Sequence, residues 1–197
     1  LMSTGSTVAW NMPNRLNFLT IVPMFHCNGW CYPWTVPMLN GRTVCLRNKD
    51  VKKIFELIDK YNITHFGGAP IILNMITGAP EADQKKLKNK VYVLTAGAPP
   101  PSIIFKKMKN LGFEVMHVYG LTETYGHVTQ CAWNDEWNDF DEDKQNEIKA
   151  RQGVRYPNTE GVTIMDPETM KEVPHDGKTI GEIMIRGNVV MKGYFKD

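Results

Sequence analysis

The sequence predicts an α/β fold in which helices cover both faces of a parallel β-sheet, followed by the start of a smaller β-rich subdomain. Two observations lead to this prediction. Short, continuous apolar segments alternate with helical patterns as far as Val118, and such segments are typical of strands buried on both faces. Beyond about Glu160 the apolar segments are separated only by turns, which indicates neighbouring antiparallel strands.

The first part of the chain holds the strands of the parallel sheet, which we predict at residues 18–22, 43–46, 63–66, 91–95 and 115–118. Asp50 can cap a helix whose apolar residues share one face, namely Val51, Ile54, Phe55, Ile58 and Tyr61. Further helices are expected at residues 1–10, at 71–76 and at about 102–111, the last with Ile103, Ile104, Met108 and Leu111 facing inward.

The pattern changes after about Cys131. Residues 134–143 are acidic and predict a surface excursion, and residues 141–150 predict an exposed helix. Strands are expected again at residues 161–165 and 181–186. We therefore divide the chain into an α/β core at residues 1–152 and a β-rich subdomain that starts at residue 153.

Composition narrows the function classes. The net charge of +2 gives no electrostatic reason to expect nucleic acid or a membrane surface as a partner, and no apolar stretch reaches the length of a membrane span. The four cysteines, Cys27, Cys31, Cys45 and Cys131, lack the spacing of a zinc site. We expect reduced thiols in a cytoplasmic protein, with homo-oligomerisation left open. Because the chain starts without Met and ends within a pattern, we also expect a fragment of a longer protein.

Three turns of small or polar residues follow predicted strands, at residues 67–70, 96–100 and 120–124. Parallel sheets bind ligands beyond the carboxyl ends of their strands, so a site is expected there. Just before the third turn, Tyr119 offers a ring face for a base, and Gly120 at its start permits close backbone approach. Thr122 offers a hydroxyl to a phosphate, and Glu123 a hard oxygen ligand to Mg²⁺. A strand followed by an ordinary polar turn is the alternative.

Four segments, in order along the chain, carry a resemblance to a known family: residues 23–30, 95–100, 119–124 and 181–194. They resemble the adenylate-forming superfamily, and specifically its acyl-CoA synthetases. Residues 25–30 and 151–156 are similar to the branch that acts on short- and medium-chain fatty acids. The resemblance implies that a carboxylic acid is activated with ATP to an acyl-adenylate, and that coenzyme A then displaces AMP.

The resemblance also implies roles for individual residues. One wall of the adenine slot would be formed by Gly97, Ala98 and Pro99, and Tyr119 would stack on the other face, with His117, Val118 and Gly120 beside it. Thr122 would bond the α-phosphate and Glu123 would ligate Mg²⁺. An ordinary strand-to-helix turn at residues 97–99 is the alternative.

The same resemblance places the acyl group near the second half of residues 23–30. His26 would lie beside the carboxylate and gate the pocket, and Trp30 and Gly120 would contact the acyl substrate. A satisfied buried histidine is the alternative for His26. Pro33 and Trp34 would lie along the acyl channel with Trp30, and helix core is the alternative for Trp34. The lysines at positions 85, 86, 88 and 90 are expected to be a solvated surface stretch.

Some parts of the family pattern are not found. Residues 3–7 only hint at the phosphate loop and contain no Lys, and the ribose-binding Asp and the adenylation lysine are not recognised. We therefore expect the ligase activity to belong to the parent enzyme and not to this chain alone. Two alternatives stay open: an aryl- or amino-acid-adenylating enzyme that loads a carrier protein, and a non-catalytic nucleotide-binding module.

Overall fold

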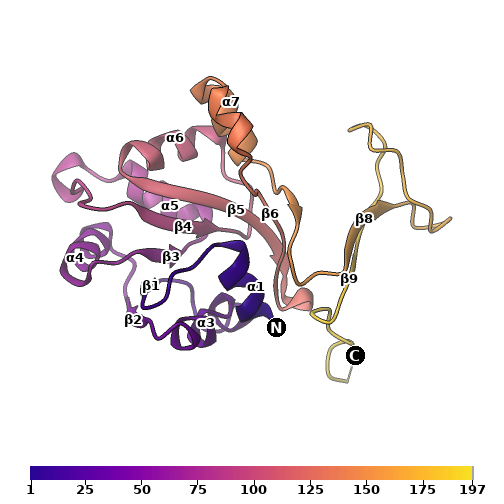
Figure 1. Cartoon of the computed structure of the whole chain (residues 1–197), viewed down its shortest axis with the longest axis horizontal. Coiled ribbons are helices and arrows are strands. Elements are labelled where there is room, and N and C mark those ends of the chain that lie inside the picture. The colour runs from indigo at the N-terminus through magenta and orange to yellow at the C-terminus, as the bar shows by residue number, and fades with distance from the viewer. Residues whose placement is uncertain (197) are drawn as a thin grey trace.

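The computed structural model describes residues 1–196 and contains a seven-stranded sheet with the order β2-β1-β3-β4-β5-β6-β7 (Figure 1). Pairing from β2 through β5 is parallel, while β6 and β7 continue the sheet in the antiparallel sense. The strands are β1 Asn17–Thr20, β2 Arg42–Cys45, β3 His65–Gly67, β4 Val91–Thr95, β5 Phe113–Leu121, β6 Gly126–Gln130 and β7 Val154–Arg155. The predicted α/β class, with helices on both faces of a mainly parallel sheet, is confirmed.

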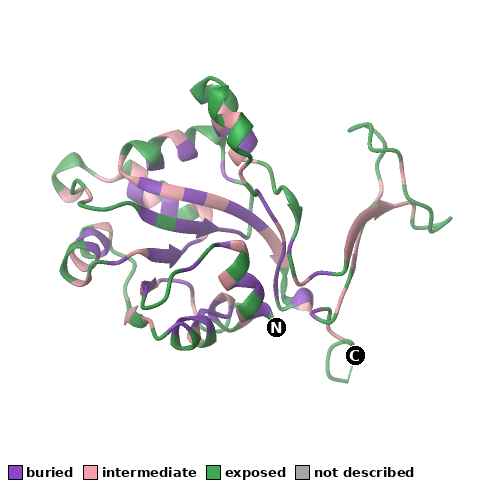
Figure 2. Cartoon of the chain, viewed as in Figure 1, coloured by how far each residue is buried: buried purple, intermediate pink, exposed green. Residues whose placement is uncertain are grey.

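Two apolar layers cover the two faces of the sheet. Helices α4 (Val51–Tyr61), α5 (Pro70–Gly78) and α6 (Ser102–Asn110) pack their buried side chains on one face. The other face is covered by residues that follow α1 (Met2–Ala9) and by α3 (Tyr32–Met38), and Figure 1 shows these two helices across the sheet from α6. Buried residues concentrate in the central strands between these layers (Figure 2).

Helix α4 forms as its sequence predicts. The Asp50 side chain accepts a hydrogen bond from the backbone N–H of Lys53 and so caps the helix. Ile54, Phe55 and Ile58 are the buried face, and Asn62 ends the helix in the left-handed conformation. In α6, however, Ile103 is exposed and Phe105 takes its place in the core. Ile104, Phe105 and Met108 share one helical face, and Ile103 lies off that face.

Strand β5 is longer than expected. The sequence predicts a strand at residues 115–118 and a turn at residues 120–124, but β5 continues through Leu121 and pairs with β6. A bulge between Tyr119 and Gly120 shifts the register. The reversal comes at Thr122–Thr124, a short 3₁₀ turn, where the Thr124 hydroxyl oxygen lies 3.0 Å from the Leu121 carbonyl oxygen and 2.9 Å from that of Gly126. The turn predicted at residues 120–124 therefore forms at its last three residues. The continuation of β5 through Leu121 depends on its pairing with β6, which no local pattern in the sequence indicates.

The last part of the chain forms a separate two-stranded antiparallel sheet, β8 (Gly161–Met165) and β9 (Glu182–Arg186), which projects from the large sheet (Figure 1). The expected surface excursion holds a 3₁₀ segment, Asp135–Asp139, and the expected exposed helix is α7, Glu142–Lys149. A short 3₁₀ segment also forms at Glu81–Asp83. The division at residue 153 stays a prediction, since β7 pairs with the large sheet and β8 begins only at Gly161.

His65 and His127 are buried in this core, and neither has a charged partner among the described residues. Burial lowers the pKa of both His65 and His127 to about 4. The folded protein therefore favours the neutral imidazoles. In the unfolded chain these groups have a pKa of about 6.5, so the free energy of unfolding is highest above that pH and decreases as the pH falls below it.

We expect the free energy of unfolding to drop by about 3 kcal/mol between pH 7.5 and pH 5.5, since each histidine contributes about 1.4 kcal/mol per pH unit below 6.5. Urea titrations at the two pH values measure this drop. The combined His65→Phe and His127→Phe variant should lose most of it, and His175→Gln, at an exposed position, should not. An undiminished drop in the double variant would contradict this origin.

Candidate active site

A cavity of about 610 Å³ lies at the carboxyl ends of the parallel strands. Each contributing strand delivers the segment that follows it: Ile21–Pro23 after β1, Gly68–Ile72 after β3 and Ala96–Ala98 after β4, with Gly120–Thr122 at the end of β5. This is the edge at which the sequence predicts a site. The remaining wall comes from His26, Cys27, Trp30 and Lys49.

The wall that carries Trp30 has an unusual backbone. From Cys27 to Cys31 every residue has a positive φ, with values of 38°, 50°, 62°, 54° and 66°. For residues other than glycine this conformation costs about 1–2 kcal/mol each, and only Gly29 is a glycine. Such strain persists where the surrounding structure holds it, and it is concentrated at functional sites. The turn aims Trp30 into the cavity wall, while Trp34 in α3 is 49% exposed and belongs neither to the core nor to the wall.

The second wall is formed by small residues after β4. Gly97 has φ +95°, and a Cβ added there would meet no atom within 4 Å. Gly97 and Ala98 line the cavity and are exposed, as is Pro99 beside them. A backbone surface without bulky side chains can receive a flat ring. These residues therefore fit the adenine wall that their sequence predicts.

Thr122 lines the cavity, and Glu123 follows it in the chain but is not among the lining residues. The Cys27 thiol lies 3.7 Å from the Thr122 hydroxyl oxygen and 3.7 Å from the Leu121 carbonyl, so the two walls meet here. The Tyr194 hydroxyl donates to Glu123 Oε1 at 2.6 Å, and this bond lowers the pKa of the Glu123 carboxyl group. The carboxylate is thus kept ionised near the cavity, which suits a hard cation such as Mg²⁺.

The structure gathers part of the predicted site set into the cavity. Lining residues include His26, Trp30, Gly97, Ala98, Gly120 and Thr122. Val118 packs in the core, and His117 is buried with Nδ1 2.8 Å from the Ala150 carbonyl oxygen. Tyr119 is half-buried in β5. The adenine-side roles of His117, Val118 and Tyr119 stay predictions, since their side chains lie outside the lining.

Sequence reasoning missed Lys49 and the apolar lining at Ile21, Val22, Ile71 and Ile72. Their positions just beyond β1, β2 and β3 were the available signal. None of the described residues that line the cavity is acidic. A cavity with a lysine, a histidine and no carboxylate favours an anionic ligand over a cationic one.

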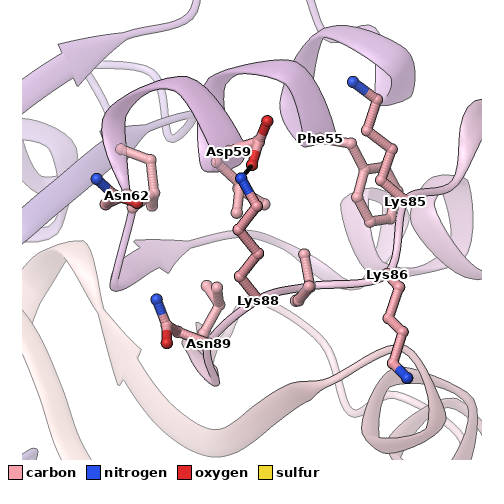
Figure 3. A pocket seen from close by; sticks show the side chains of 11 residues that line it. Phe55, Asp59, Asn62, Lys85, Lys86, Lys88 and Asn89 are labelled. Carbon is pink, nitrogen blue, oxygen red and sulfur yellow. Dashed lines mark ion pairs between the residues drawn. The ribbon is translucent and has the colours of Figure 1, made fainter.

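The basic stretch lies elsewhere, around a cavity of about 200 Å³ near the amino ends of β3 and β4 (Figure 3). Lys88 forms an ion pair with Asp59 at 2.5 Å, whereas Lys85 and Lys86 point in opposite directions. These lysines do not converge on one point. Their position on the surface agrees with the solvated stretch expected from the sequence.

Comparisons with known proteins give a family match and similar sequences. Residues 1–195 match the family described as AMP-binding enzyme. The whole chain is 48% identical to an acetate/butyrate–CoA ligase of Arabidopsis thaliana named as peroxisomal, and 49% identical to an acetate–CoA ligase of Humulus lupulus. In both comparisons the chain spans 35% of the relative's length.

Solved structures share the fold. The N-terminal domain of FACL13 from Mycobacterium tuberculosis superposes with a TM-score of 0.82 at 22% identity, over 100% of this chain and 46% of that one. O-succinylbenzoate Coenzyme A synthetase from Bacillus subtilis, in complex with ATP and magnesium, gives a TM-score of 0.77 at 20% identity, over 99% of this chain and 38% of that one.

The close approach of β5 and β6 at Gly120 yields a test. A Cβ at Gly120 would lie 1.9 Å from the carbonyl oxygen of Gly126, so Gly120→Ala must force the hairpin apart. We expect a loss of about 3–5 kcal/mol in the free energy of unfolding. Gly78→Ala is the matched control because an added Cβ there meets nothing within 4 Å. Denaturant titration compares the two, and equal stabilities would refute the close approach.

Proposed function

Because this chain belongs to the AMP-binding enzyme family over residues 1–195, we propose that it is part of an acyl-CoA synthetase. The protein would activate a carboxylic acid with ATP and pass the acyl group to coenzyme A, as an AMP-forming acid–thiol ligase. One observation carries the proposal: a single cavity joins the small-residue wall at Gly97 and Ala98 to the apolar wall at Trp30. A nucleotide and an acyl group can therefore meet beside Thr122.

The acid is proposed to be short. Relatives that match the whole chain are named as ligases of acetate, of acetate or butyrate, and of 2-methylpropanoate. The absence of acidic side chains among the described lining residues disfavours an amino-acid substrate, whose ammonium group needs a carboxylate partner. His26 and Lys49 supply the cationic and polar surface that a carboxylate requires. The cytoplasmic location stays a prediction, since one relative is named as peroxisomal.

The residues in and beside the cavity have distinct tasks in this proposal. Adenylation needs stabilisation of negative charge at the α-phosphorus. Thr122 donates its hydroxyl to an α-phosphate oxygen, and the wall at Gly97 and Ala98 orients the base, with Tyr119 as its stacking partner. Glu123 would hold Mg²⁺, which supplies charge neutralisation at the phosphates. Tyr194 fixes the Glu123 carboxylate through its hydroxyl, and His26 orients the acid.

Product analysis of the whole protein tests the proposal. With ATP, Mg²⁺, coenzyme A and butyrate, we expect butyryl-CoA, AMP and pyrophosphate in equal amounts. ADP and inorganic phosphate as products would point to a different reaction class, and AMP formation that requires an amino acid would favour the carrier-loading alternative. Mass spectrometry of the thioester and chromatography of the nucleotides distinguish these outcomes.

Glu123→Gln tests the metal-holding carboxylate, because the substitution removes the charge and keeps the shape. We expect the rate of acid-dependent pyrophosphate release at saturating Mg²⁺ to fall by about two to three powers of ten, or about 3–4 kcal/mol of transition-state stabilisation. ATP affinity should change far less. Glu136→Gln, at an exposed position in the Asp135–Asp139 segment, is the matched control. A wild-type rate in Glu123→Gln would remove the metal role.

A further inference from the structure

Trp30 is held against the backbone of the sheet. A Cβ added to Gly67 would lie 3.0 Å from Trp30 Cε3 and 3.4 Å from Val22 Cγ2. The indole therefore occupies the space beside β3 that a side chain at position 67 would need. Gly67 is buried and ends β3, and Trp30 lines the 610 Å³ cavity. The position of this one ring thus sets how far the cavity extends along β3.

The backbone beneath Trp30 does not fix the ring by itself. Trp30 lies within the strained left-handed turn, and a relaxed turn would aim the indole elsewhere. A second contact is supplied from β6, where the His127 imidazole and the Trp30 indole form a T-shaped pair with ring centroids 5.7 Å apart and planes at 82°. Edge-to-face pairs of this kind are favourable beyond the apolar area that they bury.

His127 is itself held by a contact with a second ring. Tyr156 packs against it in a second edge-on contact, with centroids 5.8 Å apart at 69°. His127 and Tyr156 are buried, and neither lines the cavity. Within the described chain His127 Nε2 has no hydrogen-bond partner, and burial keeps the ring neutral by lowering its pKa to about 4. Neither a charge nor a hydrogen bond from Nε2 accounts for a histidine at this position. The imidazole therefore acts on Trp30 through its volume and the orientation of its ring.

We propose that His127 is a positioning residue that holds Trp30 against Gly67 and thereby limits the acyl pocket to short acids. This inference rests on the proposed function, which assigns the Trp30 wall to the acyl group. It predicts a selective effect. A histidine that only stabilised the fold would, when removed, lower the rates for all acids by a similar factor, whereas a positioning histidine changes the preference among acids.

The test measures kcat/KM of the whole protein for acetate, butyrate, hexanoate and octanoate. We expect His127→Ala to raise the octanoate-to-acetate ratio of kcat/KM by about tenfold or more. A single methylene group that newly fits into an apolar pocket changes kcat/KM by a factor of about ten. The change should appear mainly in KM. Trp30→Ala should give the same shift, and the double variant should add nothing, because both changes remove one wall. His127→Phe should keep the wild-type ratio.

His65→Ala is the matched control, since His65 is also buried with a pKa lowered to about 4 but contacts Trp10 and Tyr92 instead of Trp30. It should leave the ratio unchanged. If His127→Ala does not fold, His127→Leu fills a similar volume without the aromatic edge and should shift the ratio. A uniform loss across all four acids, or shifts that add in the double variant, would overturn the proposal.

Acrylamide quenching gives a readout that is independent of catalysis. The Trp30 contribution is the fluorescence difference between each protein and its Trp30→Phe counterpart. We expect this contribution to be quenched about twofold more strongly in His127→Ala than in wild type, and equally in His127→Phe. Equal quenching in all three would overturn the positioning role. A wild-type protein that forms no acyl-CoA, yet shows the expected quenching, would refute the proposed function and leave the Trp30–His127 contact standing.

Discussion

Parallel pairing of β2, β1, β3, β4 and β5 is the constraint on which the rest of the structure depends. It sends the carboxyl end of every one of these strands to the same edge of the sheet. Segments that are far apart in sequence, such as Pro23 and Ala98, therefore line one cavity. Parallel pairing also requires helices as connections, and the helices on the two faces bury the apolar layers that make the sheet stable.

A second arrangement closes the cavity. β5 runs past its parallel partner and turns back as β6, which carries Gly120 and Thr122 to the turn at residues 27–31. The Cys27 thiol contacts at Leu121 and Thr122 join these two segments. From the far end of the chain, Tyr194 binds Glu123 and the Met191 N–H donates to the Glu123 carbonyl. The C-terminal segment is thereby tied to the residue proposed to hold the metal.

The sequence predicted the regular elements because local physics determines them. Asp50 and the apolar face of α4 need no knowledge of the rest of the chain, and β4 has the predicted limits. The position of Ile103, the length of β5 and the left-handed turn at residues 27–31 depend on tertiary contacts, so periodicity could not give them. The proposed role of His127 could not be predicted from the sequence for the same reason, because it depends on Trp30 and Tyr156 both packing against the imidazole.

If the proposal is right, one cavity receives both the nucleotide and the acyl group. A crystal structure of the whole protein with a non-hydrolysable butyryl-adenylate analogue would show whether it does. We expect adenine beside Gly97 and Ala98, an α-phosphate oxygen bonded to the Thr122 hydroxyl, and the end of the acyl chain against Trp30. An analogue bound instead at the Lys85–Lys88 cavity, or with its acyl chain directed away from Trp30, would show that the two groups do not share this cavity.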